Sequence, residues 1–221
     1  MSGKSYRYIV FFGGAICAYV FLRHIFVTQA RPLRNDIIQG AAVGFGLSLL
    51  TAQIIAEFKT VKVNGWAAMY GLGAPGNGMF MRAACALAFP GPVNAPQEAF
   101  YWKTNVDGAK RVLSGEHNYV MRFPPGGLPP NNAFWSLTMG DAANRFVENP
   151  INRYSVGDRT GLVPNADGSV DVYIRRTAPA GAESNWLPAP PGKFILWLRV
   201  YLPGAEITDG KYIVPPVTEA G

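Results

Sequence analysis

Cysteine and histidine are scarce in this sequence of 221 residues, which contains two of each. The only histidine beyond the apolar N-terminal region is His117, and no CxxC pair is present. An ordinary zinc, iron or copper site needs several such ligands, so we expect no catalytic metal and no cofactor. Cys17 and Cys85 are interpreted as small apolar side chains rather than as a disulfide, because Cys17 lies in an apolar run.

Charge is also scarce: charged residues make up 15% of the chain and hydrophobic residues 49%. Soluble domains usually carry about 25% charged residues, so we expect part of the chain to contact lipid. The net charge of +6 is not concentrated in one region. Residues 1–58 contain five Lys/Arg and two Asp/Glu, and the remainder contains fifteen and twelve, so each part carries +3. No basic cluster marks a phosphate-binding surface, which argues against a nucleic-acid partner.

Two long apolar runs stand near the start of the sequence. The first, YIVFFGGAICAYVFL at 8–22, reaches the length of a membrane span when it is extended past Arg23 and His24. A signal peptide is the alternative, but no clean cleavage site follows it. We predict membrane helices at 8–27 and 37–58, which form a hairpin. The predicted organisation is a membrane part at 1–58 and a globular domain at 59–221.

The arrangement of these two helices is less well determined by the sequence. Gly40 and Gly44 form a GxxxG pair that allows two helices to approach closely, although ordinary membrane-helix composition explains the pair equally well. Basic residues flanking the runs number four on one side and three on the other, so their distribution leaves the orientation open.

From about residue 60 the sequence changes to short apolar stretches separated by Gly, Pro, Asn and Asp, which is typical of a β-rich domain. One stretch, 77–89, has helical spacing, with Asn77 as its expected N-cap. In SVDVYIRR, which follows a turn at Gly168, apolar and polar residues alternate, so we expect one face buried and the other exposed. KFILWLRVYL is apolar on both faces, which predicts a central strand. The predicted strands are 98–105, 117–123, 133–139, 169–176 and 193–202.

Four segments together resemble a known family. They are AFWSLTMGDAANRFVENPINRYSVGDR at 133–159, NADGSVDVYI at 165–174, ESNWLPAPPGKFILWLRVYLP at 183–203 and DGKYIVPPV at 209–217. The region from about 65 to 217 resembles the bacterial family catalogued as domain of unknown function 1214. The resemblance implies an antiparallel β-sandwich of jelly-roll type on exported or envelope-associated proteins, with no established activity. It favours a bacterial inner-membrane location with the β domain on the periplasmic side.

The polar segment VENPINRYSVGDRTGL at 147–162 is the most informative candidate for a site. Its many hydrogen-bonding groups suit either a loop locked against the domain or the lining of a polar pocket. Arg153 and Arg199 lie in apolar surroundings, so we expect each to pair with an acid, and Asp158 and Asp141 are the natural counter-charges. The candidate ligand-binding or polar-network residues are Trp135, Asp141, Asn152, Arg153, Asp158, Arg159, Asn185, Trp186 and Arg199.

The stretch NWLPAPP leads into the predicted central strand. Its prolines restrict the chain, while Trp186 is expected to pack over the edge of the domain and Asn185 to hydrogen-bond to backbone. On the strand itself, we expect Arg199 to stack between Trp197 and Tyr201.

Two functions of different classes remain open. The scarcity of histidine and cysteine and the absence of a GxSxG motif favour a membrane-anchored binding or complex-assembly protein of the cell envelope. Its partners would be the lipid bilayer and either another membrane protein or a second copy of the chain. The alternative is an envelope enzyme of hydrolase or lyase type that uses a carboxylate and an arginine of the same loop.

Overall fold

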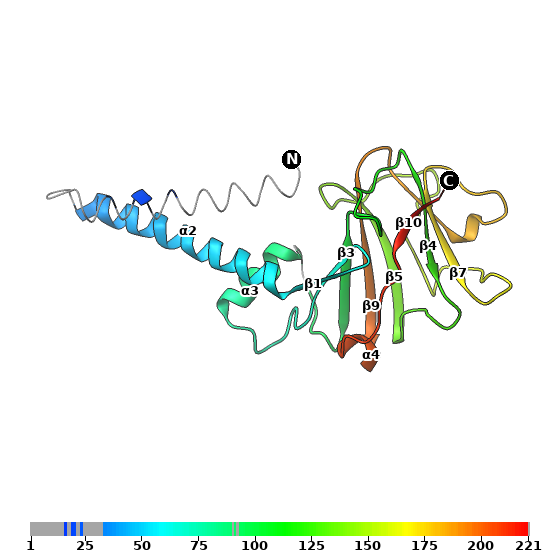
Figure 1. The fold of residues 1–221 in the computed structure, drawn as a ribbon, viewed down its shortest axis with the longest axis horizontal. Coiled ribbons are helices and arrows are strands. Elements are labelled where there is room, and N and C mark those ends of the chain that lie inside the picture. The colour runs from blue at the N-terminus through cyan, green and yellow to red at the C-terminus, as the bar shows by residue number, and fades with distance from the viewer. Residues whose placement is uncertain are drawn as a thin grey trace. The chain divides into compact units, whose positions relative to one another are not determined.

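Figure 1 shows the computed structural model of the chain, which describes residues 16, 19, 20, 23, 33–89, 91 and 93–220. The chain divides into two compact units. One comprises Met1–Lys59 and Gly76–Gly91, and the other comprises Thr60–Pro75 and Pro92–Gly221. We call them the helical unit and the β domain, and each is described by itself.

In the helical unit, α2 (Leu33–Lys59) contacts α3 (Met79–Ala88). Within α2, the segment Ile37–Lys59 is long and apolar enough to cross a membrane. Large apolar side chains of this helix, such as Phe45 and Phe58, are exposed rather than packed inside the unit. The second predicted span therefore coincides with a helix of suitable length and composition.

The first predicted span, 8–27, falls mostly outside the described residues. Only positions 16, 19, 20 and 23 of it are described, and all four are helical. Within the described part of the chain, one helix has the length and composition of a membrane span, so the second predicted span has a counterpart and the two-helix hairpin stays a prediction.

Helix α3 confirms the predicted helix at 77–89, but the expected N-cap is wrong. The N-cap is Gly78, which forms no side-chain cap. Arg82 contacts this end of the helix in two ways: its backbone N–H donates to the Gly78 carbonyl at 3.0 Å, which is the ordinary i to i−4 bond of a helix, and its Nε donates to the Asn77 carbonyl at 3.0 Å. The second bond holds the chain that leads into α3, but it is not a cap, because a cap accepts from the free N–H groups of the first turn.

The β domain contains two sheets (Figure 1). The six-stranded sheet has the order β1-β2-β3-β9-β5-β6, and all its neighbouring pairs are antiparallel. The four-stranded sheet has the order β10-β4-β7-β8, in which β7 and β8 are parallel. The domain is therefore mainly β, as predicted, but one sheet is mixed rather than purely antiparallel. The bounds are β1 Thr60–Val63, β2 Trp66–Met69, β3 Ala99–Thr104, β4 Asn118–Phe123, β5 Asn131–Asp141, β6 Ser155–Gly157, β7 Val170–Arg175, η1 Glu183–Asn185, β8 Trp186–Pro188, β9 Phe194–Pro203, α4 Ala205–Thr208 and β10 Val217–Ala220.

Strand β9 is the central strand that its apolar sequence predicts, because it lies between β3 and β5. Its side chains at alternate positions, including Leu196 and Leu198, are fully buried. They belong to one apolar core to which the four-stranded sheet contributes Met121 and Val172. The opposite face of β9 is less closely covered, and Arg199 there is half-buried.

A tight hairpin joins β1 to β2 and brings the start of the β domain onto the edge of the six-stranded sheet. Its turn is Asn64-Gly65, and both residues have positive φ, at 53° and 85°. Asn-Gly is the preferred pair for such two-residue turns, because both positions need left-handed backbone. This pair was a signal for two strands that the sequence analysis did not predict.

Strand β7 departs from the predicted alternation of buried and exposed faces. The turn before it places Gly168 at a φ of 81°, as expected. However, Ser169 and Asp171, which were expected to face solvent, are both buried. Neighbouring polar side chains cover this face of the strand, as described below for the network around Asn185.

Candidate functional site

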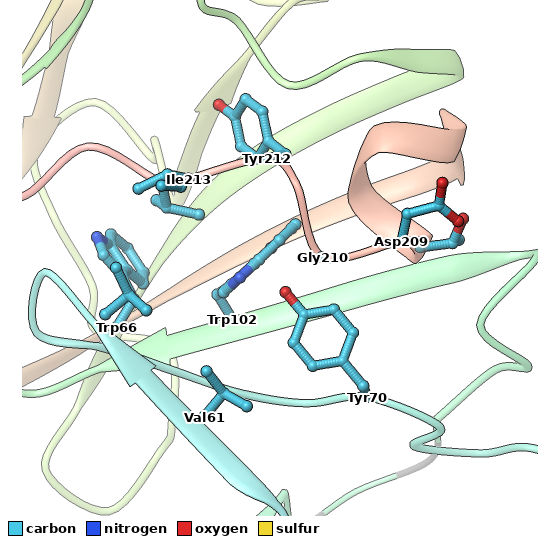
Figure 2. A pocket seen from close by; sticks show the side chains of 11 residues that line it. Val61, Trp66, Tyr70, Trp102, Asp209, Gly210, Tyr212 and Ile213 are labelled. Atoms are coloured by element: carbon cyan, nitrogen blue, oxygen red, sulfur yellow. The ribbon is translucent and has the colours of Figure 1, made fainter.

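The β domain contains a pocket of about 550 Å³ whose walls are rich in aromatic side chains (Figure 2). Strands β1, β2 and β3 form one wall, and the segment Thr208–Val214 forms the other. We call it the aromatic pocket, defined by Trp66, Tyr70, Trp102 and Tyr212. Its volume lies within the range of small-molecule sites, about 300–1,000 Å³.

The segment from Asp209 to Pro216, which we call the strap, is held across the sheet by side chains. The indole N–H of Trp66 donates to the Pro215 carbonyl at 2.8 Å, and the amide of Asn64 donates to the Val214 carbonyl at 3.0 Å. Farther along, the hydroxyl of Tyr212 donates to the Gly127 carbonyl at 3.0 Å. The hairpin turn that positions Trp66 thus also fixes the strap, so the pocket has two well-anchored walls.

The aromatic rings of the pocket also contact one another. The centre of the Trp102 ring lies 4.5 Å from the centre of the Phe100 ring and 6.0 Å from that of Tyr212. The ring centres of Tyr70 and Phe100 lie 5.1 Å apart. Such tilted and edge contacts are favourable geometries for aromatic pairs. They hold the pocket open with rigid side chains.

The pocket is close to electrically neutral. Burial raises the pKa of the Tyr70 phenol and of the Tyr212 phenol, so both stay protonated at neutral pH. Its one acidic lining residue, Asp209, pairs with Lys211 at 3.1 Å. The site therefore favours an uncharged ligand over an ion.

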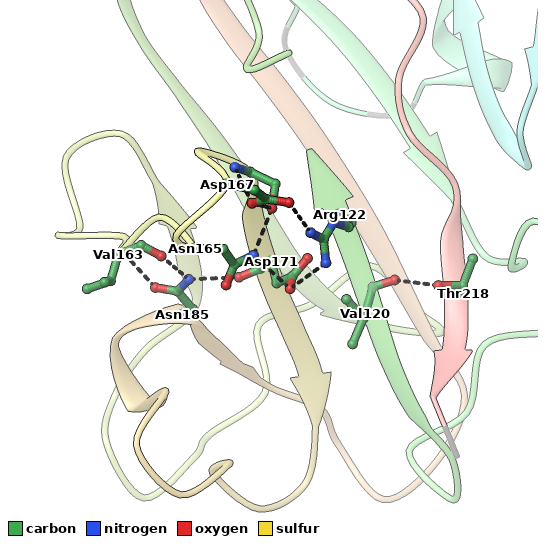
Figure 3. Close-up of polar contacts among 9 residues, drawn as sticks. Val120, Arg122, Val163, Asn165, Asp167, Asp171, Asn185 and Thr218 are labelled. Atoms are coloured by element: carbon green, nitrogen blue, oxygen red, sulfur yellow. Dashed lines mark hydrogen bonds and ion pairs between the residues drawn. The ribbon is translucent and has the colours of Figure 1, made fainter. Parts of the chain in front are cut away.

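Polar side chains form a second cluster on the four-stranded sheet (Figure 3). The Asn185 side chain accepts from the Val163 N–H at 2.8 Å and donates to the Val163 carbonyl at 2.8 Å and the Asp171 carbonyl at 2.9 Å. Asn165 donates to an Asp171 carboxylate oxygen at 3.0 Å, and Arg122 lies 3.4 Å from the same oxygen. This network explains why Asp171 is buried, and Asn185 binds backbone as predicted.

Arg153 binds the loop 147–162 to the segment around the start of β8. Its guanidinium donates to the carbonyls of Glu183 at 2.6 Å and Trp186 at 2.9 Å, immediately before and within β8. The side chain of Asn149 fixes the backbone of Arg153. Its amide oxygen accepts from the Arg153 N–H at 2.9 Å, and its amide nitrogen donates to the Arg153 carbonyl at 3.0 Å. Asn152 lies between them at a positive φ of 50°. The contacts are those of a locked loop rather than of a pocket lining.

Asp158 and Arg159 have partners within the same sheet. The Asp158 carboxylate accepts from the backbone N–H of Trp135 at 3.3 Å, and the Arg159 guanidinium donates to the Ala133 carbonyl at 3.1 Å. Arg159 also lies over the ring of Phe134 at 4.4 Å. Both residues therefore hold the loop against β5.

The predicted pairing of Arg199 with Asp158 or Asp141 is wrong. Arg199 donates to the hydroxyl of Thr138 at 3.0 Å and lies 5.5 Å from the centre of the Trp197 ring. Asp141 instead binds Arg145 at 2.9 Å. Because Arg199 is only half-buried, partial hydration of the guanidinium removes the need for an acid.

Two other expectations for these arginines also fail. Tyr201 stacks on Phe134 at 4.3 Å, so Arg199 is not held between Trp197 and Tyr201. Arg153 binds carbonyl oxygens in place of a carboxylate. The structure thus brings Arg153, Asn185 and Trp186 together around the start of β8.

His117 precedes β4 instead of lying within a strand, and its Nδ1 is 2.8 Å from a carboxylate oxygen of Glu219. Glu219 also pairs with Arg111 at 2.6 Å. Among the described residues, no group of three or more His, Cys, Asp or Glu side chains is placed to hold a metal ion.

None of the nine candidate residues lines the aromatic pocket. The residues that line it were not predicted from the sequence. Those residues come from opposite ends of the domain, since Trp66 is in β2 and Tyr212 is in the strap. Their only sequence signal was the position of GW and DGKYIVPPV at the two limits of the family resemblance.

The described residues define a mainly β domain of two sheets with an aromatic pocket, associated with an apolar helix of membrane-spanning length. Residues 98–205 match the model of the family described as "Protein of unknown function (DUF1214)", which is the family that the motifs of the sequence resemble. No curated protein matches the chain.

Two solved structures are similar to this chain. The VPA0106 protein from Vibrio parahaemolyticus is 22% identical, with a TM-score of 0.64, covering 88% of this chain and 47% of its own. An uncharacterized protein from Burkholderia cenocepacia is 16% identical, with a TM-score of 0.43, covering 98% of this chain and 49% of its own. This chain therefore spans about half the length of each. The likeness to VPA0106 concerns the fold alone.

Proposed function

We propose that the chain is a membrane-anchored binding module of the bacterial cell envelope, which takes a small apolar ligand into the aromatic pocket. In this proposal α2 anchors the chain in the inner membrane, the two sheets form a β-sandwich of jelly-roll type, and the β domain lies on the periplasmic side. The pocket carries the proposal, because its volume and its aromatic walls suit a ligand rather than a packed core.

The anchoring part of the proposal is supported by the composition of α2. Its segment Ile37–Lys59 is long and apolar enough to span a bilayer, and its side chains are largely exposed in the chain itself. The sandwich is supported by the single apolar core to which both sheets contribute. The ligand would act together with a membrane-protein partner or a second copy of the chain.

An envelope enzyme that uses a carboxylate and an arginine has less support. Arg153 binds carbonyl oxygens, and Arg199 binds the Thr138 hydroxyl. Of the candidate carboxylates, Asp141 binds the backbone N–H and the guanidinium of Arg145, and Asp158 accepts from the backbone N–H of Trp135 in β5. Neither the aromatic pocket nor a smaller pocket lined by Asn185 has a candidate arginine among its lining residues.

Occlusion of the pocket tests the proposal. Val61 and Ile213 line it with 46% and 62% of their surface exposed, so larger side chains there should fill it without disturbing the core. Val112 and Ile151, at 48% and 45% exposed, are matched positions outside it. The probe is 1-bromododecane, added to the full chain in phosphatidylcholine vesicles, because bromine quenches indole fluorescence on contact.

We expect saturable quenching in the wild-type protein, because Trp66 and Trp102 line the pocket. The double variant Val61→Phe/Ile213→Phe should bind the probe about tenfold more weakly, since it displaces buried methylene groups. Val112→Phe/Ile151→Phe should behave as wild type. Equal quenching in both double variants would show that the ligand does not enter the aromatic pocket.

A further inference from the structure

The indole N–H of Trp102 is an unused hydrogen-bond donor in the aromatic pocket. Trp102 is 4% exposed, and among the described residues its nitrogen has no hydrogen-bond partner. Among the described residues, Asp171 Oδ1 is the one unpaired side-chain atom that is completely enclosed by protein. The Trp102 nitrogen is therefore not completely enclosed, and some of its surface is accessible to a ligand. Buried tryptophan nitrogens usually find a partner, and the indole of Trp66 follows this rule by binding Pro215.

A second unused polar group lies on the same pocket. The hydroxyl of Tyr70 has no hydrogen-bond partner among the described residues, and it too keeps some surface that protein atoms do not cover. Figure 2 shows it directed toward the strap near Gly210. The strap passes closely there, because a Cβ added to Gly210 would stand 3.4 Å from that hydroxyl. The ligand of this pocket is therefore expected to carry an uncharged oxygen.

The small number of polar groups limits the ligand class. A sugar needs many hydrogen-bonding partners, whereas the remaining walls are apolar or, like Trp66 and Tyr212, have polar atoms already bound to backbone carbonyls. A charged headgroup would need a counter-ion, and the acidic lining residue Asp209 is already paired with Lys211. An apolar chain or ring with one neutral oxygen fits both restrictions.

The position of the pocket along the chain indicates where such a ligand comes from. Val61 in the pocket wall follows Lys59, the last residue of α2, by two residues. Two residues of extended chain cover at most about 7 Å. In the sequence, a residue of the pocket wall therefore follows the candidate membrane span almost directly, and the neutral oxygens of lipids lie at the edge of the hydrocarbon region.

We propose that the aromatic pocket binds a lipid chain that ends in an uncharged hydroxyl or carbonyl oxygen, with Trp102 Nε1 donating to that oxygen and the Tyr70 hydroxyl binding it as a second partner. The apolar part of the chain lies against Trp66, Tyr212 and the aliphatic rim. This inference rests on the proposed function, since it specifies the ligand class of the same pocket.

Two brominated probes separate this inference from the proposed function. 2-Bromododecan-1-ol carries the hydroxyl next to its bromine and 1-bromododecane lacks the hydroxyl, and both are titrated into the full chain in phosphatidylcholine vesicles. The measured quantity is the ratio of their apparent affinities in each variant, so that partitioning into the bilayer cancels between variants. Trp66 remains as a reporter when Trp102 is replaced.

We expect the ratio in favour of the alkanol to fall about fivefold in Trp102→Phe and in Tyr70→Phe, because each variant loses one hydrogen-bonding group while an aromatic ring remains at the position. Tyr201→Phe, which alters a tyrosine outside the pocket, should leave the ratio unchanged. An unchanged ratio in both pocket variants, with bromododecane still bound, would overturn the inference and leave the proposed function standing. The absence of saturable quenching by either probe would overturn the proposed function itself. Tighter binding of 2-bromododecanoate than of the alkanol would overturn the neutral-ligand assignment.

Discussion

At the scale of single residues, the side chain of Asn185 does more for the β domain than that of Arg199. Asn185 is 4% exposed and satisfies three backbone groups of two other segments. Arg199 is half-buried and holds one hydroxyl, that of Thr138. The sequence correctly predicted backbone binding by Asn185 and incorrectly predicted a buried ion pair for Arg199.

This difference predicts that Asn185→Ala destabilises the β domain more than Arg199→Ala does. Asn185→Ala leaves buried N–H and C=O groups unpaired and should lower the free energy of unfolding by about 3 kcal/mol. Arg199→Ala loses one hydrogen bond and one contact with Trp197 and should cost about 1 kcal/mol. Denaturant unfolding of both variants, with Arg199→Lys as the control that keeps the charge, measures the order. A larger loss for Arg199→Ala would mean that the arginine has a buried acidic partner after all.

The reason why the sequence predicted some residues and not others is geometric. Gly168 was predictable because its turn is made by adjacent residues, and a positive φ is a local requirement. The partner of Arg199 was not, because the choice between Thr138, Asp141 and Asp158 depends on the register of β5 against β9. Register is a property of two strands, and the composition of one strand does not determine it.

At the scale of elements, the five predicted strands correspond to β3, β4, β5, β7 and β9. The strands that were not predicted, β1, β2, β6, β8 and β10, have three or four residues each. So short a stretch shows too few alternations for a period of two to be recognised. The parallel pairing of β8 with β7 depends on the locked segment around Asn185, which no local pattern indicates.

Helix α2 carries the prediction for the membrane. We expect the full chain to remain in the pellet after alkaline carbonate extraction of membranes, because the segment Ile37–Lys59 has the length and composition of a span. The substitutions Leu47→Lys and Ile54→Lys, at exposed positions of α2, should weaken this retention. Each buried charge raises the free energy of membrane insertion by about 2.5–3.5 kcal/mol near the centre of a span. Val112→Lys and Ile151→Lys in the β domain are the matched control substitutions. Release of the wild-type chain by carbonate would contradict membrane anchoring.

At the scale of the whole molecule, the aromatic pocket was out of reach of sequence reasoning. It combines the β1–β2 hairpin, Trp102 in β3 and the strap, and these segments meet only when both ends of the β domain are assembled. The apolar core was more predictable, because alternation within each strand already separates inward from outward side chains.

The carboxylates of the β domain predict a loss of stability in acid. Burial opposes ionisation of Asp107, but the backbone N–H and guanidinium of Arg111 more than offset it and lower its pKa. The Arg145 backbone N–H lowers the pKa of Asp141, and the Ser169 hydroxyl lowers that of Asp167. Each depressed pKa contributes stability above the unfolded value of about 3.9, which is lost as the pH falls through the folded value.

We therefore expect the melting temperature to be nearly constant from pH 7 to pH 5 and to fall below about pH 4. Asp107→Asn should flatten this fall, because that residue then has no proton to take up. Melts recorded by circular dichroism between pH 7 and pH 2.5 measure the effect. A melting temperature that rises on acidification would contradict the assignment of these carboxylates as stabilising groups.

The place of β9 in the six-stranded sheet has a consequence for how the chain reaches its native state. β9 pairs with β3 on one side and β5 on the other, yet it follows both in the sequence. Until β9 arrives, β3 and β5 each present an unpaired edge that can join another chain. Pairings between strands so distant in sequence form slowly, because the intervening loop must close first. Aggregation should therefore compete with refolding in proportion to protein concentration, and dilution should raise the yield of native domain.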